Sequence, residues 1–207
     1  MRSRSIVLAP LLAACTGGAP ARQGSTVQQV RASAAGTPVT VEGIVSVPSG
    51  VIDAGFALTD GEAGIHVAAD STQRFAAGDR VRVTGKRGDV HGMASVQPDS
   101  VKRLGEGTLP PPKTVRTGEV GEATEGWRVR VSGRAVAPVV SDLPYGYKLW
   151  IDDGSGRLQL FFAPSAGDFE LSRIRVGQTV TATGFSGQYD SVYEVLPTSP
   201  TDLQIAP

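Results

Sequence analysis

The sequence has one cysteine and two histidines among its 207 residues. A single cysteine excludes an internal disulfide, a thiolate metal cluster and a dithiol redox pair. His66 and His91 have no nearby serine or acid pattern of the kind that builds a catalytic triad. Long amphipathic helical patterns are also missing. We therefore expect a protein without enzymatic activity, cofactor or metal site. Its hydrophobic core must stabilise the fold without disulfides.

The chain has no excess of charge of either sign, because 20 basic residues balance 20 acidic ones. Such a chain has no global field that would attract nucleic acid or an anionic membrane. Any binding of a polyanion would have to come from a local patch. The 26 glycines and 14 prolines separate short runs rich in valine, threonine and isoleucine. This composition is typical of an all-β protein with many turns.

The N-terminal segment has the features of an export signal. Arg2 and Arg4 precede a short apolar run at 6–12, and the small residues Ala13 and Ala14 follow it. A charged start, an apolar middle and a small-residue cleavage site occur in this order in secretory signals. The apolar run has about half of the roughly 20 residues that a membrane-spanning helix needs. The segment therefore predicts export rather than a transmembrane anchor.

Cys15 follows this signal directly, and the segment resembles the lipobox of bacterial lipoproteins. The resemblance implies that residues 1–14 are removed as a signal peptide and that Cys15 is lipidated. Residues 15–26 would then form a flexible tether, with the lipid on Cys15 as the only attachment to the membrane. Thr16 stands where lipoproteins retained at the inner membrane carry aspartate. By this resemblance we expect the outer membrane in a two-membrane organism, and otherwise the cell surface.

The rest of the chain contains an internal repeat. The sequence VTVEG at 39–43 returns as VRVSG at 129–133, and GDRVRVTG at 78–85 returns as GQTVTATG at 177–184. Matching segments that recur in the same order along the chain are typical of a duplicated domain. We predict a first domain over 27–108, a proline-rich linker over 109–115 and a second domain over 116–207.

Each copy has five short segments in which apolar residues alternate, as in half-buried strands. The Asp-Gly pairs at 60–61 and 153–154 predict tight hairpins between the second and third strands. Short helical turns are expected over 71–77 and 168–176. Three strands, a short helix and two strands resemble the OB-fold, a small Greek-key barrel. We predict an all-β chain of two tandem five-stranded OB-fold-like Greek-key barrels, each with a short helix between strands 3 and 4; two small β-sandwiches are the alternative.

The resemblance extends to a more specific group of domains. The stretches VQQVR at 27–31, GTPVTVEGIV at 36–45 and GIHV at 64–67 are similar to accessory OB-like domains of secreted bacterial nucleases. The likeness covers residues 27–104 and, more loosely, 116–205. It implies nucleic acid binding beside a catalytic domain. No catalytic domain is recognisable in this sequence, so the resemblance implies binding and not cleavage.

The predicted binding face lies on the second copy. OB barrels commonly bind ligands on the outer face of strands 2 and 3, between the 1–2 and 4–5 loops. Alternation there places cations and aromatic residues outward, a mixture used for single-stranded nucleic acid, since bases stack on rings for about 1–3 kcal/mol each. The predicted ligand-binding residues are Arg128, Arg130, Lys148, Trp150, Gln159 and Phe161, together with Tyr145 and Tyr189 from the loops.

Two alternatives remain beside single-stranded nucleic acid. The equivalent face of the first copy, with Ala57 and His66, has no outward aromatic residue, so this copy is expected to be a spacer or a packing partner. Outward aromatic residues on a barrel often pack against a neighbouring domain, so Trp150 and Phe161 are alternatively expected to pack between the domains. The second copy has eight basic and eleven acidic residues, and phosphate contacts dominate nucleic acid affinity. The alternative function is therefore a structural or adaptor envelope lipoprotein with a protein or glycan partner.

Overall fold

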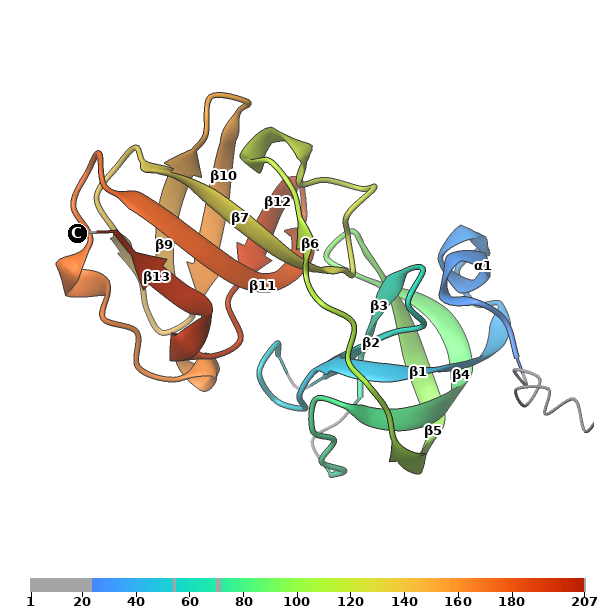
Figure 1. Ribbon diagram of the computed structural model, residues 1–207. Coiled ribbons are helices and arrows are strands. Elements are labelled where there is room, and N and C mark those ends of the chain that lie inside the picture. The colour runs from blue at the N-terminus through green and yellow to red at the C-terminus, as the bar shows by residue number, and fades with distance from the viewer. Residues whose placement is uncertain (1–23, 54, 70–71, 207) are drawn as a thin grey trace, which may run out of the picture.

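The computed structural model describes residues 24–53, 55–69 and 72–206. The predicted signal peptide, Cys15 and most of the predicted tether lie outside these residues. Two β-barrels follow one another along the chain (Figure 1). No helix in the described part is both long enough and apolar enough to cross a membrane.

A short helix, α1 (Val27–Ala32), precedes the first barrel. The Thr26 hydroxyl accepts a hydrogen bond from the Gln29 N–H at 3.2 Å, and the Gln29 side chain accepts one from the Thr26 N–H at 2.9 Å. This reciprocal pair is a capping box, which satisfies two N–H groups at the start of a helix. Val27 and Val30, one turn apart, are buried. The helix therefore packs onto the first barrel through its apolar side.

The first barrel is closed, in the order β1-β2-β3-β5-β4 (Figure 1). Alternating apolar residues fill its interior, among them Val39, Val41 and Val45. Its strands are β1 (Pro38–Val47), β2 (Phe56–Thr59), β3 (Gly64–Val67), β4 (Asp79–Val90) and β5 (Met93–Glu106).

The second barrel repeats this arrangement, with β7, β9, β10, β11 and β12 in the places of β1 to β5. The six residues that alternation predicts to point inward, Val129, Val131, Leu149, Ile151, Leu158 and Leu160, are each at most 2% exposed. The all-β class and the tandem OB-like barrels are therefore confirmed. The strands are β6 (Lys113–Thr114), β7 (Arg128–Ala135), β8 (Val140–Asp142), β9 (Gly146–Asp152), β10 (Arg157–Phe162), β11 (Thr179–Tyr189), β12 (Val192–Leu196) and β13 (Leu203–Ile205).

The connection between the third and fourth strands differs from the predicted single helix. In the second barrel it forms two 3-10 turns, η2 (Pro164–Ala166) and η3 (Leu171–Arg173). In the first barrel, the described residues 72–78 contain turns and a bend but no helix. Isolated helices this short are marginal. In the second barrel, Ile174 is anchored in the core and Leu171 packs against it, so packing sets the path of the chain.

The chain between the barrels is partly ordered by strand pairing. Residues 109–112 have no regular secondary structure, and β6 then pairs in parallel with β7, with Lys113 opposite Val129. The Lys113 ammonium lies 3.1 Å from the centre of the Trp127 ring. A cation over the face of an indole ring is attracted by its quadrupole. The second barrel is thus tied to the end of the linker.

Candidate functional site

Four of the predicted binding residues lie together on neighbouring strands of the second barrel. In the antiparallel pair of β9 and β10, Gln159 stands opposite Trp150, and Phe161 stands opposite Lys148. All four side chains are half-buried, and their neighbours Leu149 and Leu160 point into the core. We call Lys148, Trp150, Gln159 and Phe161 the β9–β10 patch. Trp150 and Phe161 occupy diagonal positions, whose Cα atoms lie about 7–8 Å apart in such pairs, within reach of aromatic side chains.

Arg128 and Arg130 do not join this patch. Both belong to the part of β7 that pairs with β11, whereas β7 meets β9 only at its other end, where Arg134 stands opposite Asp152. The Arg128 guanidinium lies 3.3 Å from the Asp202 carboxylate, and that of Arg130 donates to the Gln204 side chain at 3.1 Å. The structure therefore places these two cations beside the C-terminal segment, on another part of the barrel surface.

The two loop tyrosines have different surroundings. Tyr145, in the turn between β8 and β9, is 72% exposed. Tyr189, at the end of β11, is 54% exposed, and its ring stacks on His91 of the first barrel with 4.3 Å between ring centres. The Asp190 N–H donates to the His91 carbonyl at 2.7 Å. Tyr145 is thus free to contact a ligand beside the β9–β10 patch, whereas one side of Tyr189 is covered.

Charges in the β9–β10 patch are largely balanced. The Lys148 ammonium lies 2.7 Å from the Asp142 carboxylate, and the Gln159 amide donates to the buried carboxylate of Glu194. Burial raises the pKa of Glu194 to about 7, although the hydrogen bond from Gln159 and the charge of Lys148 act in the opposite direction. The patch therefore offers aromatic rings and polar groups with little net positive charge.

The equivalent face of the first barrel is closed by the second barrel. Phe185 of β11 is fully buried and packs in one cluster with Val47, Ile52, Ala57 and Met93 of the first barrel. We call these five residues the inter-barrel cluster. Apolar side chains removed from water in this way stabilise the contact. The structure thus makes the first barrel a packing partner, whereas the side chains of the β9–β10 patch remain half-exposed.

His66 also lies on the closed face. It stands opposite Ala57 on β2 and Ser95 on β5, and it is only 2% exposed. Burial lowers the pKa of His66 to about 4, while the charge of Asp53 opposes this shift. The imidazole is therefore neutral at physiological pH. Neither ring nitrogen has a hydrogen-bond partner among the described residues. Because the ring is buried and neutral, His66 is unsuited to contact a polyanion.

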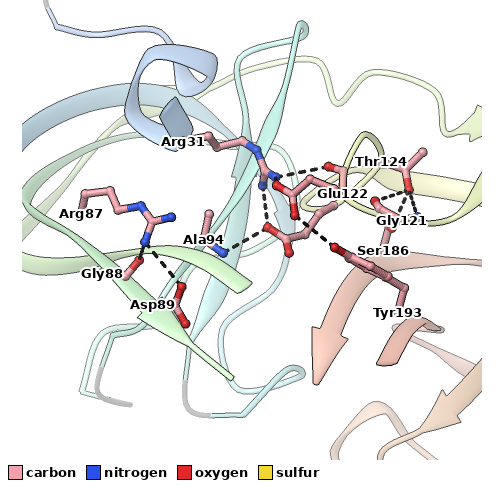
Figure 2. Close-up of polar contacts among 11 residues, drawn as sticks. Arg31, Arg87, Gly88, Asp89, Ala94, Gly121, Glu122, Thr124, Ser186 and Tyr193 are labelled. Carbon is pink, nitrogen blue, oxygen red and sulfur yellow. Dashed lines mark hydrogen bonds and ion pairs between the residues drawn. The ribbon is translucent and has the colours of Figure 1, made fainter. Parts of the chain in front are cut away.

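Polar contacts at one edge of the interface join α1, β5 and the turn before β7 (Figure 2). The Arg31 guanidinium lies 2.9 Å from the Glu125 carboxylate, which also accepts the Ala94 N–H at 3.1 Å. Arg31 reaches Glu122 at 3.1 Å, and the Tyr193 hydroxyl donates to Glu122 at the same distance. Burial raises the pKa of Glu125, against the charge of Arg31 and the hydrogen bond from Ala94. This Arg31–Glu125 contact fixes one barrel against the other.

A close approach of two backbones requires glycine beside this contact. A Cβ atom added to Gly64 of β3 would lie 1.9 Å from the carbonyl oxygen of Gly126. No real Cβ atom makes such a contact, so one backbone would have to move. Gly64 and Gly126 therefore let the barrels meet without intervening side chains.

Sequence reasoning did not identify Phe185, Glu125 or Glu194. A signal for Phe185 exists, because Thr181 and Thr183 mark the outward positions of β11 and a large apolar residue follows at the same spacing. This signal is weak, because single hydrophobic residues on a surface are common and only contiguous apolar patches mark contacts. Glu125 and Glu194 have no such local signal.

In the part of the chain that the structure describes, no group of three or more potential ligand side chains is placed to hold a metal.

No family model and no curated protein matches the chain. Similar solved structures include an OBody, AM1L10, bound to hen egg-white lysozyme, at 17% identity and a TM-score of 0.39, covering 48% of this chain and 98% of that chain. The Stn1-Ten1 complex of S. pombe is 19% identical with a TM-score of 0.31, and the match covers 38% of this chain and 57% of that chain. Asparaginyl-tRNA synthetase from Pyrococcus horikoshii is 20% identical with a TM-score of 0.38, and the match covers 44% of this chain and 22% of that chain. This chain thus spans only about a fifth of the length of the synthetase.

Proposed function

We propose that this protein binds single-stranded nucleic acid on the β9–β10 patch of its second barrel. The observation that carries the proposal is the pair of half-exposed rings, Trp150 and Phe161, at diagonal positions of adjacent strands. Bases stack on such rings without regard to sequence. Exposed Tyr145 stands at the end of the same strand pair and offers a third ring.

Stacking, and not phosphate contact, supplies most of the proposed affinity. Lys148 is the only cation of the patch and is paired with Asp142, while Arg128 and Arg130 lie elsewhere. Each phosphate contact to a single strand contributes about −0.7 to the slope of log affinity against log salt. We therefore expect a slope of about −1, which corresponds to one or two phosphates. A steep slope would indicate binding on another surface.

We propose a binding protein and not an enzyme. His66 is buried and neutral, and the His91 ring is stacked on Tyr189. The two His66 nitrogens have no hydrogen-bond partner among the described residues, and His91 Nδ1 lies 3.5 Å from the Asp190 carboxylate. The β9–β10 patch holds no histidine, cysteine or acid of its own.

Replacing Trp150 by alanine should weaken the binding of oligothymidylate about tenfold to a hundredfold, because one stacking platform is lost. The affinity can be measured by fluorescence anisotropy of a labelled strand about ten nucleotides long, within the range that one OB barrel covers. The matched control is Trp127→Phe, since Trp127 is the other tryptophan and lies under Lys113. Equal affinities of Trp150→Ala and the wild type would remove the β9–β10 patch from the proposal.

The proposal also places the protein outside the cytoplasm, with lipid on Cys15 as its anchor. In a two-membrane bacterium, Cys15→Ala should accumulate as an uncleaved precursor, because the thiol that carries the lipid is gone. Fractionation and gel mobility read this out. A Cys15→Ala variant that stays in the outer membrane and migrates like the wild type would refute the anchor.

One observation favours the alternative of an adaptor with a protein or glycan partner. The Lys148–Asp142 ion pair at 2.7 Å leaves the patch with little positive charge, as suits a ligand without phosphate. If oligothymidylate fails to bind while Trp150 and Phe161 are accessible, the adaptor function replaces nucleic acid binding.

A further inference from the structure

Exposed apolar side chains gather on one hairpin of the second barrel. Seven large hydrophobic residues are exposed in the described part of the chain, and four of them fall within residues 136–145. They are Val136, Val140, Leu143 and Tyr145. Leu143, in the loop after β8, is 59% exposed. A local concentration of exposed apolar surface marks an interaction site.

The strand of this hairpin also has an open edge. β8 pairs with β9, with Val140 opposite Lys148, and within residues 24–53, 55–69 and 72–206 it pairs with no other strand. An open strand edge presents unpaired N–H and C=O groups that can pair with another chain. Charged residues and prolines commonly protect such edges. β8 has one charged residue, Asp142, whose carboxylate pairs with Lys148, and Pro138 and Pro144 lie on either side of the strand. Val140 and Leu143 are nevertheless exposed at this edge and can attract apolar partners.

A cavity of about 590 Å³ adjoins β8 at the end of the barrel. Val139 and Leu143 line it from the hairpin, Tyr147 lines it from β9, and Phe169 and Leu171 line it from the opposite loop. The Phe169 ring is held edge-on against Phe162, with 5.0 Å between ring centres. A volume of this size lies within the range of pockets that enclose a small ligand or a few side chains.

The chemistry of the cavity favours a basic peptide over a phosphate-bearing ligand. Asp168 lines the cavity, and its carboxylate has no hydrogen bond or ion pair with another described residue. No lysine or arginine is among the lining residues. An unpaired carboxylate beside apolar walls is complementary to a cation that adjoins an apolar side chain.

We propose that the open edge of β8 and the adjacent cavity bind an extended peptide segment of a partner protein. The segment would add a strand to β8, place an apolar side chain in the cavity and direct a basic side chain towards Asp168. Strand addition takes its affinity from main-chain hydrogen bonds and its specificity from pockets for alternate side chains. This site adjoins the β9–β10 patch, since Val140 of β8 stands opposite Lys148, and it gives the protein a second partner of a different class.

The probe is a labelled peptide, acetyl-Lys-Val-Lys-Phe-Lys-Val-Lys-amide, measured by fluorescence anisotropy. We expect saturable binding that weakens about tenfold when alternate backbone amides are N-methylated, because strand pairing needs those N–H groups. Asp168→Lys should weaken binding of the unmethylated peptide by a similar factor, and Leu143→Ser provides a second variant at an exposed position. Trp150→Ala should leave peptide affinity unchanged, which separates this site from the proposed nucleic acid site.

Several results would overturn the peptide site. The first is the absence of saturable peptide binding up to about 1 mM; a Kd of about 1 mM corresponds to only about −4 kcal/mol. The others are equal affinity of the N-methylated and unmethylated peptides, and equal affinity of Asp168→Lys and the wild type. Binding of neutral maltohexaose without binding of the peptide would assign the cavity to a glycan and also overturn it. Loss of oligothymidylate binding alone, with peptide binding intact, would refute only the proposed function.

Discussion

Replacing Phe185 by alanine should lower the free energy of unfolding by about 4 kcal/mol, the usual loss when a buried phenylalanine is truncated. The Phe185 side chain is fully buried, and it is the second barrel's member of the inter-barrel cluster. It points away from the core of its own barrel, so the truncation opens a cavity between the barrels. Urea unfolding followed by circular dichroism gives the free energy.

The control is Phe185→Leu, which keeps most of the apolar volume and should cost less than about 1.5 kcal/mol. A loss below about 1 kcal/mol for Phe185→Ala would mean that the barrels do not depend on this contact.

Replacing Glu125 by alanine should lower the free energy of unfolding by about 3 kcal/mol, because it removes one partner of a buried ion pair. Glu125 is 1% exposed, and its loss leaves the Arg31 guanidinium without its buried partner and the Ala94 N–H without an acceptor. An unsatisfied buried donor is costly in itself. Thermal and urea unfolding of the same variant should agree on the loss.

Glu122→Ala is the matched control for this prediction. Glu122 contacts the same arginine, but its side chain is 72% exposed. Exposed ion pairs contribute about 0–1 kcal/mol, so this variant should remain close to the wild type. Equal losses for the two variants would show that burial of Glu125 does not set the strength of the Arg31–Glu125 contact.

Much of the fold could be predicted because the relevant information is local. Alternation with a period of two identifies the inward residues of a strand, and Val129, Val131, Leu149 and Ile151 are buried as predicted. The repeated segments then define two similar barrels. The three-residue strands β8 and β13 escaped prediction because they are too short to show a periodic pattern.

The candidate site was predictable only in part. Alternation identifies which residues point outward, so it correctly places Trp150 and Phe161 on the surface of the barrel. It does not reveal which strands are neighbours at each position along a tilted barrel. Arg128 therefore lies beside Asp202, away from the β9–β10 patch. Glu125 and Ala94, 31 residues apart, meet only through the packing of one barrel on the other.

The same packing exposes the corresponding strands of the two similar barrels to different extents. The first barrel presents Ala57 and His66 on the face that OB barrels commonly use for ligands; both are buried, Ala57 within the inter-barrel cluster. The second barrel keeps the corresponding strands, β9 and β10, half-exposed. Under the proposed function, duplication thus provides one barrel for support and one for binding.

Hydrogen exchange with and without oligothymidylate tests this division most directly. Bound nucleic acid should slow the exchange of backbone amides across β9 and β10, residues 146–162, and leave the strands of the first barrel unchanged. Protection on β1 and β4 of the first barrel, with none across residues 146–162, would contradict the assignment of the β9–β10 patch as the binding face.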